Sequence, residues 1–221
     1  HKPDRRQRQM CIRDSYNPVQ TEWVPWLATD YSWQDNNKKL LFTIRSGVQW
    51  SDGKPFTAHD VAYTFNLKKQ YPALDTRNSW GFLESVDAVS DTKVEVSFNR
   101  VYVPGFGAIA EQIIIPKHIW RELDDPLKFS NPNPVGTGPF TEVLRFNSQV
   151  WELGKNPNYW QPGKPHIEKL TFPTHSNNEQ TTLSLLSGKL DWAGAFIPAI
   201  ERIFVAKDPE HHHYWLSLIH I

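Results

Sequence analysis

Histidine and carboxylate side chains are the groups in this 221-residue chain that could bind a metal or transfer a proton. The run His211-His212-His213 suggests a zinc site. Adjacent histidines point in divergent directions, however, and Zn²⁺ would need a third or fourth ligand from elsewhere. We therefore favour a solvated turn at this run, and we expect neither a metal nor another cofactor.

Two other histidines are candidates for proton transfer. His59 is adjacent to Asp60, but Thr57 and Asp60 have the spacing of a helix capping box, which already accounts for the Asp60 carboxylate. Neither His59 nor His118 has an obvious nucleophile within its own motif. The sequence therefore gives no direct support to nucleophilic catalysis.

A secreted glycoside hydrolase is the enzymatic alternative, because such enzymes place two carboxylates on either side of a sugar. The candidate carboxylates are Asp52, Glu84, Asp87 and Asp191. They fall in predicted turns or strands, with no spacing that marks a pair. A hydrolase would turn over an oligosaccharide, whereas a binding protein would capture its ligand without forming a product, so product analysis separates the two hypotheses.

Alternating and helical hydrophobic patterns predict the elements that position these groups. Leu40, Phe42 and Ile44 alternate with more polar residues, as in a half-buried strand. Ser51 to Lys54 forms a tight turn, because Asp-Gly tolerates positive φ. The predicted strands are 29–34, 39–45, 83–89, 93–98, 140–145, 149–153 and 168–172. The predicted helices are 58–70, which carries Val61, Phe65 and Leu67, and 116–123, with Pro116 at its first position. A third helix is predicted over 177–186, with Leu183 and Leu186 inward and Gly188 as C-cap.

The run Pro134 to Phe140 contains two glycines and two prolines in seven residues. Glycine permits φ values closed to other residues, and proline removes a donor and locks φ. The run therefore predicts a constrained backbone path that leads into a strand.

Five ordered motifs between residues 31 and 192 resemble those of the bacterial extracellular solute-binding proteins of family 5, the peptide- and oligosaccharide-binding receptors of ABC importers. They are residues 47–65, Ile115–Trp120, Pro134–Phe140, Asn156–Trp160 and Leu186–Trp192. The resemblance implies a mixed α/β, periplasmic-binding-protein-like type II fold from the cluster of large three-lobed receptors, here truncated. It also implies a protein that is not an enzyme.

The resemblance places ligand contacts in two loops. One is Asn78-Ser79-Trp80, where the Trp80 indole could stack on a sugar or apolar side chain and donate its N–H, or could instead cap the core of the lobe. Phe82 is expected to pack inward. The other follows Asp191, where Gly194 would let ligand approach the backbone, and Trp192 and Phe196 could line the pocket or anchor the loop.

The family layout gives the expected organisation of the chain. Residues 16–134 correspond to the smaller inserted lobe and 135–215 to the start of the first main lobe, and the second main lobe is expected to be absent. Residues 1–15 and 216–221 are interpreted as non-native tails, which resemble translated adapter sequence. Because truncation would expose surface normally covered by the missing lobe, we expect exposed apolar patches on the main-lobe portion.

Composition limits the possible partners. The 24 basic and 24 acidic residues balance, which argues against a nucleic-acid partner. The single cysteine, Cys11, excludes an internal disulfide. No stretch approaches the roughly 18 consecutive apolar residues of a membrane span. The family resemblance, and not the composition, implies a monomer that lies in the periplasm or outside the cell, with lipid anchoring left open, and that works with ABC permease subunits.

The expected ligand is an oligopeptide, because most of the family binds peptides. Cello-oligosaccharides are the alternative within the family, since residues 196–201 and 205–210, followed by Tyr214 and Trp215, resemble a branch that includes such binders. The ten tryptophans agree with sugar binding, because aromatic stacking is a common way to hold sugars.

Overall fold

A computed structural model of the chain describes residues 14–17 and 22–214. These residues form two compact units. The larger unit contains the described residues up to 144 together with 152–170, and the smaller unit contains 145–151 and the residues from 171 onward. This division follows compactness and does not test the lobe boundary expected at 134/135, which stays a prediction.

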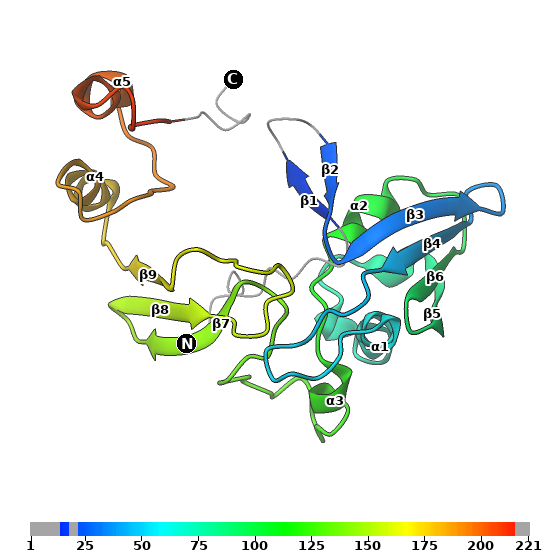
Figure 1. Ribbon diagram of the computed structural model, residues 1–221. Coiled ribbons are helices and arrows are strands. Elements are labelled where there is room, and N and C mark those ends of the chain that lie inside the picture. Colours follow the sequence, from blue (N-terminus) through cyan, green and yellow to red (C-terminus); the bar gives the residue numbers. More distant parts are fainter. Residues whose placement is uncertain (1–13, 18–21, 215–221) are drawn as a thin grey trace. The chain divides into compact units, whose positions relative to one another are not determined.

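An antiparallel four-stranded sheet forms the centre of the larger unit, with the strand order β3-β4-β6-β5 (Figure 1). The strands are β3 (Ala28–Gln34), β4 (Lys39–Ile44), β5 (Leu83–Ser90) and β6 (Lys93–Phe98). Leu40, Phe42 and Ile44 are all at most 2% exposed, which confirms the alternation expected from the sequence. On β6 the buried positions alternate in the same way, so both central strands present one apolar face to the core.

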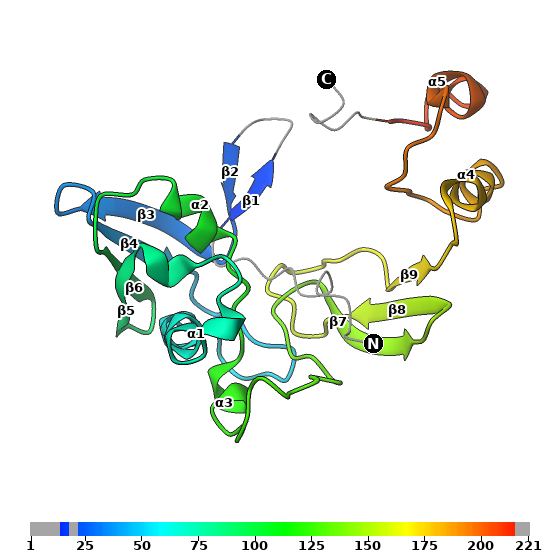
Figure 2. The same cartoon turned by 180° about the vertical axis from the view of Figure 1, so that it is seen from behind.

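Helix α1 (Ala58–Gln70) packs against this sheet, as the view from behind shows (Figure 2). The predicted inward residues Val61, Phe65 and Leu67 are buried. The predicted capping box is also present: the Thr57 side chain accepts from the His59 amide, and the Asp60 carboxylate accepts from the Thr57 amide at 2.9 Å. The beginning of α1 is therefore encoded locally, and its apolar face sets its position on the sheet.

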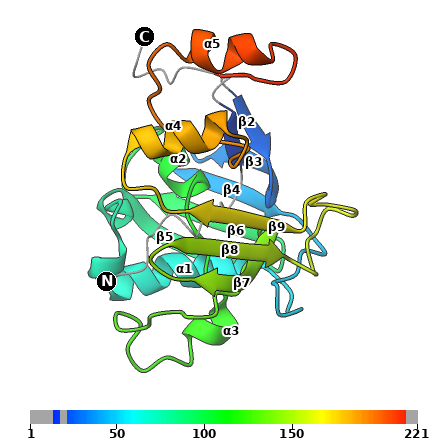
Figure 3. The same ribbon diagram turned by 90° about the vertical axis from the view of Figure 1, so that its left-hand side faces the viewer.

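The other elements of the described residues are shorter. They are β1 (Asp14–Asn17), β2 (Glu22–Pro25), η2 (Pro72–Leu74), η3 (Ser79–Gly81), α2 (Gly105–Ala110), α3 (Lys117–Trp120), β7 (Phe140–Phe146), β8 (Val150–Lys155), β9 (Lys169–Pro173), α4 (Asn178–Leu186), α5 (Ile200–Ile203) and η4 (Val205–Lys207). Strands β7, β8 and β9 form a three-stranded sheet in that order (Figure 3). No helix in the described part of the chain is long and apolar enough to cross a membrane.

Helix α3 is shorter than the helix predicted over 116–123. Pro116 is its N-cap, in extended geometry, and is not its first helical residue. The helix ends at Trp120, and Asp124, Asp125 and Pro126 follow closely, residues that favour turns over helix.

Helix α4 in the smaller unit has the predicted ends but a different inward face. The Asn177 side chain caps its N-terminus, and Gly188, at φ +71°, ends it with the two backbone bonds of a Schellman motif. Leu183 is 66% exposed, so its predicted inward position is wrong, and Leu185 is the buried leucine. Side chains two positions apart on an α-helix point in directions that differ by about 200°, which puts Leu183 and Leu185 on opposite faces of the helix.

The main hydrophobic core lies in the larger unit, between residues 27 and 114. The smaller unit and the strands leading to it expose several large apolar side chains: Phe146, Phe172, Leu183, Trp192 and Phe196. Large apolar side chains are also exposed in the larger unit, Val89 and Val101 among them, so the apolar patches expected on the main-lobe portion stay a prediction.

Candidate functional site

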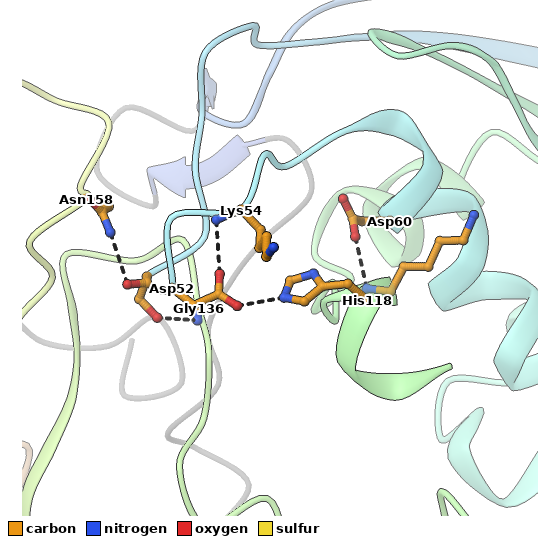
Figure 4. Close-up of polar contacts among 8 residues, drawn as sticks. Asp52, Lys54, Asp60, His118, Gly136 and Asn158 are labelled. Carbon is orange, nitrogen blue, oxygen red and sulfur yellow. Dashed lines mark hydrogen bonds and ion pairs between the residues drawn. The ribbon is translucent and has the colours of Figure 1, made fainter. Parts of the chain in front are cut away.

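Four of the five motifs come together in the larger unit, where three of them contact the Ser51–Gly53 turn of the first (Figure 4). Gly53 has a φ of +81°, as expected for an Asp-Gly turn. The Asp52 carboxylate accepts from the Lys54 amide at 3.2 Å and lies 2.7 Å from Nε2 of His118. A turn encoded locally is thus joined to α3, which is 66 residues further along the chain.

The glycine run contacts the same turn through its backbone. The Ser51 amide donates to the Gly136 carbonyl at 2.8 Å, and the Gly136 amide donates to Oγ of Ser51 at 3.2 Å. Asn158 adds a third connection, because its side-chain amide donates to the Ser51 carbonyl at 3.1 Å (Figure 4). The motifs therefore form one hydrogen-bonded junction, which we call the motif junction and define as Ser51, Asp52, His118, Gly136 and Asn158.

The expected backbone of the glycine run needs a correction. Within the described residues, the glycines with positive φ are Gly47, Gly53, Gly163 and Gly188, so neither Gly136 nor Gly138 uses the left-handed region. The constraint on this run comes instead from the two hydrogen bonds between the Gly136 backbone and Ser51, one to the Ser51 amide and one to its Oγ, and from the burial of Thr137, which is 2% exposed.

Asp60 links α1 to α3 in addition to capping α1. One carboxylate oxygen accepts from the Thr57 amide at 2.9 Å. The other accepts from the Lys117 amide, also at 2.9 Å (Figure 4). Asp60 is 5% exposed. Since both carboxylate oxygens accept from backbone amides, Asp60 has a structural role that connects two helices. This agrees with the interpretation that the capping box accounts for the Asp60 carboxylate.

The remaining histidine and carboxylate candidates do not form a catalytic group in the described residues. His59 lies 3.3 Å from the exposed Asp91, and His118 pairs with Asp52 while Ser51 Oγ bonds to Gly136. Glu84, Asp87 and Asp191 lie at exposed positions.

The histidine run is held by local contacts. His211 bonds to Asp208 at 2.9 Å, and His212 stacks on Phe204 with ring centroids 3.9 Å apart. No group of three or more potential metal ligands gathers in the part of the chain that the structure describes.

The first predicted ligand loop places Trp80 against the core of the larger unit. Its indole N–H donates to the Phe65 carbonyl at 2.9 Å, and its backbone amide donates to the Asp75 carboxylate at 3.0 Å. The Lys69 ammonium lies 4.4 Å from the ring centroid, within cation–π range. In this geometry the indole N–H is not free to bind a ligand, so any ligand contact of Trp80 would use the ring.

The residues before Trp80 shape the same loop. Asn78 has a left-handed backbone with φ 50°, and Ser79 is fully buried with an Oγ that has no hydrogen-bond partner among the described residues. A Cβ on Gly81 would lie 2.9 Å from the Asn78 side-chain nitrogen, so a larger residue at position 81 would force the Asn78 side chain to shift. Phe82 is 7% exposed, which confirms that it packs inward.

The second predicted ligand loop lies in the smaller unit. Trp192 and Phe196 are each 64% exposed. A Cβ on Gly194 would lie 3.1 Å from the Trp192 ring, so the indole packs directly over the glycine backbone. Ligand contact by Asn78, Ser79, Trp80, Trp192, Gly194 and Phe196 stays a prediction.

Replacing Trp80 with phenylalanine tests the structural role of its N–H. The variant leaves the Phe65 carbonyl without this donor, and we expect a loss of about 1 kcal/mol in the free energy of unfolding. Urea denaturation followed by circular dichroism measures it. Trp33→Phe is the control, because the Trp33 ring packs against Phe98 in a tilted arrangement, with centroids 5.4 Å apart, and its indole N–H makes no comparable bond among the described residues. Equal losses in both variants would contradict the assigned role.

A pocket of about 240 Å³ in the larger unit, which sequence reasoning missed, contains Lys68 beside Gln112 and Arg77. The Lys68 ammonium donates to the Gln112 side-chain oxygen. Burial, partly offset by the Asp75 charge, lowers the pKa of Lys68 to about 8. No sequence pattern marks this lysine, because its burial depends on a segment 44 residues away.

The lowered pKa of Lys68 predicts a pH-dependent stability. Between about pH 8 and pH 10.5 the unfolded chain binds more protons at this position than the folded chain, so stability rises with pH there. The free energy of unfolding of the unsubstituted chain, minus that of Lys68→Met, should therefore be larger at pH 9.5 than at pH 7.5. Urea denaturation of both proteins at both pH values gives this difference, and a difference independent of pH would refute the assignment.

Comparison with known proteins shows that this fold is the mixed α/β, periplasmic-binding-protein-like fold. The chain belongs to the bacterial extracellular solute-binding proteins, family 5: the model of that family's middle region matches residues 22–217. Protein XP55 of Streptomyces lividans is 34% identical over 172 residues, which cover 74% of this chain and 30% of that protein. The oligopeptide-binding protein OppA of Bacillus subtilis is 28% identical over 186 residues, which cover 76% of this chain and 34% of that protein.

Solved structures show the same relationship. A periplasmic oligopeptide-binding protein of an ABC transporter from Thermotoga maritima is 28% identical, with a TM-score of 0.80 over 90% of this chain and 38% of that protein. A second structure of a Thermotoga maritima protein so described, with bound mannohexaose, is 29% identical, also with a TM-score of 0.80, over 90% of this chain and 37% of that protein. The chain thus spans about a third of the length of the relatives it matches.

Proposed function

We propose that this chain is part of the substrate-binding component of an ABC importer, which captures oligopeptides by closure of its lobes and delivers them to a membrane permease. The observation that carries the proposal is the family match over residues 22–217, in which the motif junction joins four of the family motifs. Oligopeptide-binding relatives from Bacillus subtilis and Thermotoga maritima support the ligand class.

Oligosaccharide capture by the same kind of receptor is the second candidate. This candidate is supported by the Thermotoga maritima structure with bound mannohexaose, because that protein has the same fold over 90% of this chain. The family is one of solute-binding proteins, so the glycoside hydrolase alternative loses support. Within the proposed receptor, which would act outside the cytoplasm, we assign ligand contact to Asn78, Ser79 and Trp80, and to Trp192, Gly194 and Phe196.

The test is a titration of a longer protein that carries this chain and extends to the length of its relatives. Tryptophan fluorescence is followed with an oligopeptide pool and, separately, with cello-oligosaccharides and mannohexaose. Saturation by peptides without product formation supports the peptide proposal, saturation by sugars alone supports the second candidate, and sugar cleavage would refute both. Trp80→Ala and Trp192→Ala should weaken binding, whereas Trp33→Phe is the matched aromatic control.

A further inference from the structure

A groove of about 820 Å³ opens on the larger unit, where the ends of β3 and β4 meet the β5–β6 turn and the loop after Trp160. Its volume falls within the roughly 300–1,000 Å³ of small-molecule sites. It contains none of the six residues assigned above to ligand contact. Its polar lining includes Arg45, Lys164, Thr29, Thr43, Ser46 and Thr92.

The charge of this groove is one-sided. Arg45 and Lys164 are cationic, and none of the described residues that line the groove is an aspartate or a glutamate. Within the described residues neither cation forms an ion pair, whereas the nearby Lys155 pairs with Glu168 at 3.1 Å and Lys169 with Glu152 at 3.0 Å. Two cations without a counter-charge favour an anion in the groove.

The Arg45 side chain is held in place before any ligand arrives. Its Nε donates to the Trp26 carbonyl at 2.9 Å, and its guanidinium lies 4.5 Å from the centroid of the Trp160 ring. Trp26 supports that ring from the side, edge-on at 5.2 Å. A guanidinium has five N–H donors and this bond uses one, so an oriented donor group remains at the groove with little ordering cost.

Hydroxyl groups give the groove a second kind of recognition. Thr43, Ser46 and Thr92 line it together with the Gln161 amide. Hydroxyls both donate and accept hydrogen bonds. They can therefore pair with the hydroxyls of a sugar, whereas the methylene groups of aspartate and glutamate side chains in an acidic peptide form no such bonds. The cations and hydroxyls therefore favour a ligand that carries both a negative charge and hydroxyl groups.

We propose that this groove binds a small hydroxylated anion, a sugar acid or a sugar phosphate, whose carboxylate or phosphate lies between Arg45 and Lys164. The proposal is independent of the solute-binding function assigned above, since it uses neither of the two ligand loops.

The test titrates the full 221-residue chain with glucose 6-phosphate, glucuronate and neutral glucose, with calorimetry and ligand-observed NMR as readouts. We expect both anions to bind saturably and glucose to bind much more weakly. Lys164→Gln should weaken anion binding roughly fivefold, because it removes one of the two charges from an exposed position. Lys38→Gln is the matched control, an exposed lysine outside the groove lining, and should leave the affinity unchanged.

Several results would overturn the proposal. Equal affinity for glucose and glucuronate would show that the negative charge is not recognised. If Lys164→Gln bound the anions as tightly as the unsubstituted chain, the binding site would not be this groove. Inorganic phosphate that binds as tightly as glucose 6-phosphate would show that the hydroxyls are not recognised. Stronger binding of a polyglutamate peptide would identify the occupant as an acidic protein segment and not a sugar.

Discussion

Phe42→Ala is expected to lower the free energy of unfolding by about 3–5 kcal/mol, the usual cost of emptying a buried aromatic site. Phe42 is fully buried in the middle of β4, opposite Tyr31 on β3 and Val94 on β6. Its ring also stacks with Phe106 at 6.1 Å. The loss is a large share of the roughly 5–15 kcal/mol that stabilises a folded domain.

Urea denaturation followed by circular dichroism measures this effect. Phe146→Ala is the matched control, because Phe146 is 56% exposed and the same atoms are removed at little cost. A loss at position 42 no larger than at position 146 would show that the four-stranded sheet is not the stable core of the chain.

Asp60→Ala is expected to destabilise the chain by about 3 kcal/mol. Without the carboxylate, the backbone amides of Thr57 and Lys117 both lose their acceptor at a site where Asp60 itself is 5% exposed. Loss of a helix cap alone costs about 1 kcal/mol, and an unsatisfied buried donor adds about 1–3 kcal/mol.

Two further variants separate these contributions. Thr57→Ala removes one side of the capping box and leaves the Lys117 bond, so its loss should be about 1 kcal/mol. Asp60→Asn keeps one acceptor oxygen and should lie between the two. If Asp60→Ala cost no more than Thr57→Ala, the link between α1 and α3 would contribute nothing to stability.

The sequence predicted the elements wherever neighbouring residues carry the information. The strands around Leu40 and Phe42 and the capped helix from Ala58 follow from alternation, helical spacing and capping residues, and the structure confirms them. The end of α4 at Gly188 was predictable for the same reason.

The errors arose where a prediction depended on what covers a residue. Leu183 and Leu186 are three residues apart and share a helix face, but spacing alone does not say which face is covered, and Leu185 is the buried one. The glycine run was correctly expected to be constrained, yet its constraint is a pair of hydrogen bonds from the Gly136 backbone to the amide and the side chain of Ser51, and not a left-handed φ.

The sequence by itself determined the family, the local elements and the positions of the candidate loops, because motifs and periodicity are properties of neighbouring residues. Only the tertiary structure decided that Asp52 contacts His118, that the Trp80 N–H donates to the Phe65 carbonyl, and that Arg45 and Lys164 line the same groove. The residues in these contacts are at least 15 positions apart in the chain, and Asp52 and His118 are 66 apart. Such contacts form only when packing of the core brings distant segments together.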